Sequence, residues 1–244
     1  MKKFSTVLIM LAIYSTSFSQ SGKSTPKAQR FGFRASGNLC WIKSTDKNLV
    51  NDGMALTGSY GFNYQEKLNK TLWYEVGMDV SRIDGRLSNN YMQTFKRITP
   101  ADTIMTNKAS YNMKLNYIEI PFSFIGKTSE IGYMTYTFQG GLTPAFLLSQ
   151  NATINYKDSI GTTKELATGK LNSNRPDDYV STTDDINFFR MGFVMGAGVE
   201  YALTKDVSVV GNLRYSNGLF RVNKFTGYDA FRTNYFALSV GILF

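Results

Sequence analysis

Charged side chains that could do acid–base chemistry stand at alternate positions in several otherwise apolar segments of this chain. Glu75 and Asp79 share one such segment, and Arg190 and Glu200 share another. Two carboxylates in different surroundings can act as a general acid and a general base, whereas carboxylates beside arginines form ion pairs. The candidate site residues, which share one face of their segments, are Arg34, Glu75, Asp79, Glu119, Arg190, Glu200 and Arg214.

The composition argues against most enzyme classes. The 244 residues include no histidine, so the Ser-His and Asp-His arrangements that activate a hydroxyl or a water cannot form. The single cysteine, Cys40, cannot form an intramolecular disulfide, and the ligands that zinc and copper prefer are missing. Asp177, Asp178, Asp184 and Asp185 lack the regular spacing of a calcium loop, which favours a solvated loop. We predict a non-enzymatic protein with no catalytic, metal-binding or cofactor-binding residues.

The segments that carry these residues have the pattern of strands. In residues 234–244 every second side chain from Phe236 to Phe244 is apolar, which gives an extended strand one continuous apolar face. Beyond the amino terminus no segment has the roughly 20 consecutive apolar residues that a helix needs to span a bilayer. A closed barrel is the other structure that pairs every backbone amide in hydrocarbon, and its strands show this alternation.

The amino terminus has the pattern of a secretory signal peptide. Lys2 and Lys3 precede an apolar run over residues 7–14, and small polar residues follow. Such a run is too short to span a bilayer and is removed after export. We expect a signal peptide over residues 1–19, a short periplasmic segment over 20–30 and a barrel domain over 31–244.

Eight strands can be placed along the mature chain, with links that alternate between long and short. This alternation is typical of outer-membrane barrels, which have short periplasmic turns and longer outer loops. We therefore predict an all-β fold, an antiparallel eight-stranded transmembrane β-barrel with short periplasmic turns and long extracellular loops. The predicted strands cover residues 31–43, 54–66, 71–83, 110–125, 132–148, 186–202, 206–216 and 231–244.

The inward faces of these strands predict a largely plugged lumen. The seven candidate site residues carry three positive and four negative charges, and the face that they share is otherwise rich in Gly, Ser and Asn. Because charges removed from bulk water are costly unless they are paired, we interpret this set as a structural polar network. A narrow charge-lined pore is the functional alternative. A soluble barrel, with its apolar faces packed inward, is a second alternative for the fold.

Three patches of the chain resemble the PorT-like outer-membrane β-barrel proteins, a porin family of outer membrane protein beta-barrel domains. They lie at residues 117–122, residues 196–201, and residues 214–219 followed by the closing strand 234–244. Within the first patch Pro121 predicts a bulge or a strand end near the periplasmic rim, because proline lacks a ladder donor. The resemblance implies an outer-membrane barrel, and some members of the family assist protein secretion to the cell surface.

Together these features predict an integral protein of the outer membrane of a Gram-negative bacterium, with a structural or surface-interaction role. The alternatives are a small porin-like passive channel and a PorT-like component that assists protein secretion or surface assembly. We expect contact with outer-membrane lipid and lipopolysaccharide, with the barrel-assembly machinery during biogenesis, and with a secretion-system protein in the second alternative. The formal net charge of +9 is spread without a basic stripe, so no nucleic-acid partner is predicted, and a monomer is expected.

Overall fold

The strands predicted from alternation form one antiparallel sheet that closes on itself. The computed structural model describes residues 28–44, 49–89, 93–95, 104–106, 109–157, 163–169, 186–204, 206–222 and 231–244. In these ranges, no helix is both long and apolar enough to cross a membrane. The strands are β1 (Gln29–Ser44), β2 (Leu49–Asn51), β3 (Ala55–Lys67), β4 (Leu72–Asn89), β5 (Gln93–Phe95), β6 (Ile104–Thr106), β7 (Ala109–Glu119), β8 (Phe122–Lys127), β9 (Met134–Lys157), β10 (Thr163–Gly169), β11 (Phe189–Ala202), β12 (Ser208–Gly218) and β13 (Phe231–Leu243).

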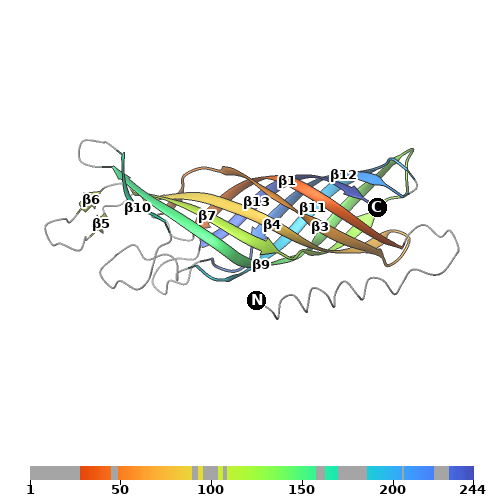
Figure 1. Cartoon of the computed structure of the whole chain (residues 1–244), viewed down its shortest axis with the longest axis horizontal. Helices are drawn as coiled ribbons and strands as arrows, with labels where there is room; N and C mark the ends of the chain where they lie inside the picture. Colours follow the sequence, from red (N-terminus) through yellow and green to blue (C-terminus); the bar gives the residue numbers. More distant parts are fainter. Residues whose placement is uncertain are drawn as a thin grey trace, which may run out of the picture.

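The ring has eight strand positions, because β7 and β8 follow one another and occupy a single position between β4 and β9. From β1 the neighbours run through β3, β4, β7 and β8, β9, β11, β12 and β13, and β13 pairs with β1. All of these pairings are antiparallel. Figure 1 shows the strands running obliquely along the long axis of the molecule. The predicted all-β, antiparallel eight-stranded barrel is confirmed.

The predicted strands match the observed ones best at the end of the barrel with the short turns. At the other end β4 continues to Asn89 and β9 to Lys157, well beyond the predicted ends at residues 83 and 148. Figure 1 shows β10 beside the far part of β9, at the opposite end from the carboxyl terminus. The outward side chains there include the ion pair of Arg82 with Asp84, at 2.8 Å. Apolar alternation therefore stops before these strands end.

A break at Pro121 divides the fourth strand of the ring into β7 and β8. Proline has no amide hydrogen to donate, but its carbonyl oxygen accepts a hydrogen bond from the Gly77 amide at 3.1 Å. The Ile120 amide donates to the Pro144 oxygen at 2.8 Å, so the neighbouring strands hold both sides of the break. The predicted break is confirmed, but its predicted place near the periplasmic rim is wrong, because the six residues of β8 separate it from the short-turn end.

The outer wall of the ring is a broad apolar surface. On the closing strand Phe236, Leu238, Val240, Ile242 and Phe244 are all exposed, with Leu238 at 66%. The odd-numbered residues from Thr233 to Leu243 point inward and are mostly buried. This face assignment was predicted from the period of two and is confirmed. It also fits a wall that contacts lipid.

Apolar side chains fill the lumen at the long-loop end, a feature that the sequence analysis missed. One buried cluster joins Ile42, Leu87 and Phe231, and a second lies beside it. Gly85 lets β4 approach β1 there, because a Cβ atom at position 85 would lie only 3.1 Å from the Cβ of Ile42. The second cluster consists of Cys40, Ile83, Leu115, Tyr117, Ala145, Ile186, Val222, Tyr235 and Ala237.

Candidate functional site

The lumen between this apolar layer and the short-turn end contains the seven predicted site residues. All seven side chains point into the ring, and each is less than one tenth exposed. They come from five positions of the ring, so residues far apart in sequence meet across the lumen. The residues are Arg34 on β1, Glu75 and Asp79 on β4, Glu119 on β7, Arg190 and Glu200 on β11, and Arg214 on β12.

Arg34 is the centre of the first group. Its Nη1 donates to Glu75 Oε1 at 2.7 Å, and its Nε and Nη2 donate to the two oxygens of Asp79 at 3.0 and 2.6 Å. The bidentate contact with Asp79 fixes the guanidinium plane. The second oxygen of Glu75 accepts hydrogen bonds from Asn63 Nδ2 at 2.9 Å and Gln65 Nε2 at 2.8 Å. The carboxylate of Glu75 is therefore fully hydrogen-bonded although it is buried.

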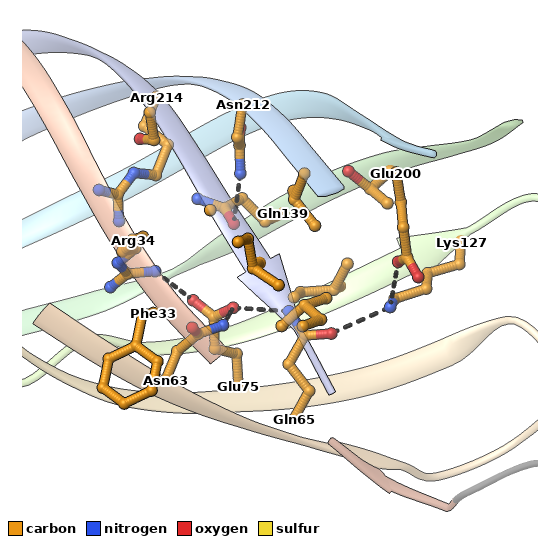
Figure 2. A pocket seen from close by; sticks show the side chains of 17 residues that line it. Phe33, Arg34, Asn63, Gln65, Glu75, Lys127, Gln139, Glu200, Asn212 and Arg214 are labelled. Atoms are coloured by element: carbon orange, nitrogen blue, oxygen red, sulfur yellow. Dashed lines mark hydrogen bonds and ion pairs between the residues drawn. The ribbon is translucent and has the colours of Figure 1, made fainter. Parts of the chain in front are cut away.

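Lys127 extends this group across the lumen to Glu200. Its Nζ donates to Gln65 Oε1 at 2.9 Å and to Glu200 Oε2 at 2.8 Å. The other oxygen of Glu200 pairs with Arg30, which also donates to Ser208 Oγ at 2.7 Å. Figure 2 shows the resulting line of side chains from Arg34 through Glu75 and Gln65 to Lys127 and Glu200.

Arg30 and Lys127 were not predicted as site residues, although each continues the alternation of its strand. Arg30 was assigned to the segment before the barrel, but β1 begins at Gln29. Lys127 was assigned to a turn, but β8 ends on it and it is 8% exposed. Its ammonium lies 4.4 Å from the ring centroid of Trp73, close enough for a cation–π contact. Extending the period of two by one residue pair at each strand end would have found both.

Arg214 is held less closely than the other lumenal arginines. Its Nη1 lies 3.9 Å from Asp79 Oδ2, an oxygen that Arg34 already occupies. Its Nη2 donates to Ser36 Oγ at 3.3 Å, and its buried Nε has no hydrogen-bond partner in the described part of the chain. With Arg30 and Lys127 included, the lumen has five cations and four carboxylates, and Arg214 is the cation without a carboxylate of its own.

Arg190 and Glu119 form a second group, nearer to the apolar layer. Arg190 is 1% exposed, and its Nη1 donates to Glu119 Oε1 at 3.0 Å. The other Glu119 oxygen accepts from the Tyr235 hydroxyl at 2.8 Å, and Arg190 Nε donates to Thr233 Oγ1 at 2.6 Å. Both oxygens of Glu119 are therefore used within this group.

The two groups touch through a pair of like charges. Asp79 and Glu119 are directly opposite each other in the register of β4 and β7. Like charges in such positions are destabilising unless each is compensated. Here each carboxylate has its own arginine, Arg34 for Asp79 and Arg190 for Glu119. The arrangement therefore ties the groups into one layer across the lumen, in which every carboxylate is paired with a cation.

Little space is left within this layer. The lumenal cavity beside Arg34, Lys127 and Glu200 has a volume of about 40 Å³. This is room for a few water molecules and is far below the several hundred Å³ of a usual ligand site. A wider pocket of about 590 Å³, lined by Trp73 and Lys67 among others, lies next to it at the short-turn end.

The other candidate positions give no chemical site within the described ranges. Cys40 is fully buried and contacts Thr57 Oγ1 at 3.2 Å. No group of three or more metal-ligating side chains occurs among the residues whose positions are described. The predicted signal peptide and the four aspartates of residues 177–185 lie outside the described residues.

Sequence comparison identifies the family of this barrel. The family model described as the outer membrane protein beta-barrel domain matches residues 18–223. The chain belongs to this family. Outer membrane beta-barrel domain proteins lie in the outer membrane of Gram-negative bacteria, so the apolar wall is the surface that meets lipid. No functionally curated protein matches the chain.

Solved structures of small outer-membrane barrels resemble this outer membrane beta-barrel domain protein in fold. Neisserial surface protein A is 16% identical, with 89% of this chain and 96% of that chain covered and a TM-score of 0.45. Ail, the attachment invasion locus protein of Yersinia pestis, is 10% identical, with 88% and 97% covered and a TM-score of 0.37. OprG of Pseudomonas aeruginosa is 8% identical, with 89% and 97% covered and a TM-score of 0.43.

Proposed function

We propose that this outer membrane beta-barrel domain protein is a non-conducting integral surface protein, whose interior is a structural plug. The observation that carries the proposal is the pair of layers that cross the lumen. The charged layer leaves a cavity of about 40 Å³, and the apolar layer contains Ile42, Leu87 and Phe231. With the inside closed, the outer wall and the long-loop end are the surfaces left for interaction.

Both layers oppose the passage of ions and small solutes. Moving an ion past Arg34 and Glu75 would separate buried pairs, and breaking a buried pair costs about 3–5 kcal/mol when one charge is left alone. Apolar constrictions resist wetting and so exclude ions without any charge. The two barriers lie in series along the lumen, which favours a closed barrel over the porin-like alternative.

An enzymatic role is not part of the proposal. Each of the four lumenal carboxylates has an oxygen within 3.0 Å of a nitrogen of a cationic side chain, which is the geometry of ion pairing. The absence of histidine from the sequence removes the usual proton carrier. The carboxylates are therefore best explained as partners of the arginines and of Lys127.

A role in secretion or surface assembly is the second candidate function. It is supported only by the resemblance to PorT-like proteins, which is weaker support than the plugged lumen gives to the first. Three residues of the resembling patches, Glu119, Glu200 and Arg214, belong to the lumenal network. Shared residues at these positions are accounted for by a shared barrel interior. A deletion strain that loses surface export, and regains it with the intact gene, would support this second candidate against a purely passive surface protein.

Single-channel recording in planar lipid bilayers tests the closed lumen. The folded protein is identified first by its faster migration on an unboiled denaturing gel, and its insertion is checked by protease protection in vesicles. We expect no steady conductance from inserted wild-type protein. The lipid-facing variant Leu238→Ala serves as the matched control and should behave as wild type. Steady conductance from the wild type would contradict the proposal and favour the porin-like channel.

A further inference from the structure

The outer wall carries a groove that combines exposed aromatic rings with two arginines, Arg221 and Arg232. The groove has a volume of about 650 Å³ and lies where β11, β12 and β13 approach the long-loop end. It lies at the edge of the apolar wall that is nearest to the long-loop end. Along β13 the exposed residues change there from the apolar Phe236 to Arg232, and Asn234 between them is buried.

The floor of the groove is aromatic and is held by a regular backbone. Phe188 is 61% exposed and Phe220 is 52% exposed, which is unusual for large apolar side chains in water but suits contact with acyl chains. The ring of Phe189 packs against Phe220, with a centroid distance of 6.3 Å. Phe146 contacts both Phe188 and Phe189, with centroid distances of 5.6 Å. These rings form a continuous apolar strip.

Backbone hydrogen bonds tie this strip to the barrel. The Leu147 amide donates to the Phe188 oxygen at 2.8 Å, and the Leu219 amide donates to the Met191 oxygen at 2.8 Å. Asn187 Nδ2 donates to the Arg221 oxygen at 2.9 Å. The groove is therefore formed in advance and does not depend on a ligand to order it.

The groove also has positively charged lining residues. Arg221 and Arg232 line it, and no carboxylate is among its lining residues. Lys43 stands directly opposite Arg232 in the register of β1 and β13. Like charges at opposite positions repel each other, and within the described ranges neither residue has a carboxylate partner. An anion placed between them would relieve this repulsion.

We propose that this groove binds a phosphorylated, acylated lipid of the outer leaflet, the lipid A part of lipopolysaccharide. The guanidinium groups of Arg221 and Arg232 bind a phosphate, which arginine does with two parallel hydrogen bonds. An acyl chain lies over Phe188 and Phe220. A free phosphate would leave the aromatic floor uncovered, and an uncharged lipid would leave the arginines without an anion. The inference does not depend on the closed lumen.

Lipid binding to the purified folded barrel in a non-ionic detergent tests the assignment. Native mass spectrometry counts bound lipid A, dephosphorylated lipid A and phosphatidylethanolamine for wild type and for the double variant Arg221→Gln/Arg232→Gln. We expect the double variant to bind lipid A at least ten-fold more weakly. Wild type should bind dephosphorylated lipid A as weakly as the double variant binds lipid A. Arg86→Gln, an exposed arginine on β4 outside the groove, is the matched charge control and should bind as wild type.

Further variants separate the phosphate contact from the acyl contact. Phe220→Ser should weaken lipid A binding several-fold while leaving the arginines in place. Equal binding by wild type and the double variant would overturn the proposal, as would an equal loss in Arg86→Gln. Competition by inorganic phosphate alone at the concentration of the lipid would also overturn it, because the site would then recognise phosphate without acyl chains. The unboiled gel shift and the absence of conductance should be unchanged in every variant, so a failure here is distinct from an open lumen.

Discussion

The buried pair of Arg190 with Glu119 should be the most sensitive electrostatic contact in the barrel. Substituting Glu119→Ala removes the acceptor for Arg190 Nη1, at 3.0 Å, and for the Tyr235 hydroxyl, at 2.8 Å. Arg190 keeps its hydrogen bonds to Thr233 and Ser216 but loses its counter-charge. Because Arg190 is 1% exposed, water cannot replace the missing carboxylate without a change in the lumen.

The size of the effect follows from these losses. Leaving one member of a buried ion pair alone costs about 3–5 kcal/mol, and an unpaired buried hydroxyl costs about 1–3 kcal/mol. The two costs overlap, because the same cavity serves both groups, so we expect Glu119→Ala to lower the free energy of unfolding by about 4 kcal/mol. Glu119→Gln keeps the shape and one acceptor, and should cost less. The double variant Glu119→Met/Arg190→Met removes both charges and should be more stable than either single variant.

Reversible urea unfolding in phospholipid vesicles, followed by the fluorescence of Trp41 and Trp73, measures these free energies. Wild type, Glu119→Met, Arg190→Met and Glu119→Met/Arg190→Met make a complete double-mutant cycle. A loss below about 1 kcal/mol for Glu119→Ala would refute the reasoning, because it would mean that water screens Arg190. Additive losses in the double variant would refute it as well, because the two side chains would then act independently.

Three further predictions concern the same lumen. Gly141→Ala should prevent folding, because its Cβ would overlap backbone atoms of β8, including a Cα at 2.6 Å, whereas Gly140→Ala has open space and should fold normally; the unboiled gel shift reports both. Cys40 should resist a water-soluble thiol reagent in the folded barrel and react fully in urea, and rapid labelling of the folded protein would indicate a wet lumen. Arg214→Met should change the unfolding free energy by less than about 1 kcal/mol, while Arg34→Met should lower it by about 3–5 kcal/mol, and similar losses would contradict the charge assignment.

The period of two was sufficient to predict the ring because one face of each spanning strand meets lipid. A slip of one residue would turn the apolar set inward, so the faces of segments such as residues 234–244 are strongly specified. The same period predicted the inward direction of the seven charged residues. The period of two does not predict a strand whose outward side chains are polar. The extensions of β4 and β9 were missed for that reason.

Pairing within the lumen could not be predicted from the pattern. Alternation gives the direction of a side chain but not its height relative to a strand elsewhere in the ring, so it does not show that Arg34 meets Glu75 or that Arg190 meets Glu119. The apolar layer was missed because inward apolar residues were expected to be small. Ile42 and Phe231 come from the first and the last strand of the chain, and only the closed ring brings them together.

The presence of two layers in series along the lumen has a consequence for ion passage. The charged layer is held by hydrogen bonds between side chains of different strands, and the apolar layer by packing of Ile42 against the backbone at Gly85. These are different kinds of interaction, so a perturbation that weakens one, such as salt for ion pairs, has little effect on the other. An ion must cross both layers, and the higher barrier limits its passage. Truncating Leu87 and Phe231 alone should therefore leave the barrel closed by Arg34, Glu75 and Lys127, and conductance should require that both layers are opened together.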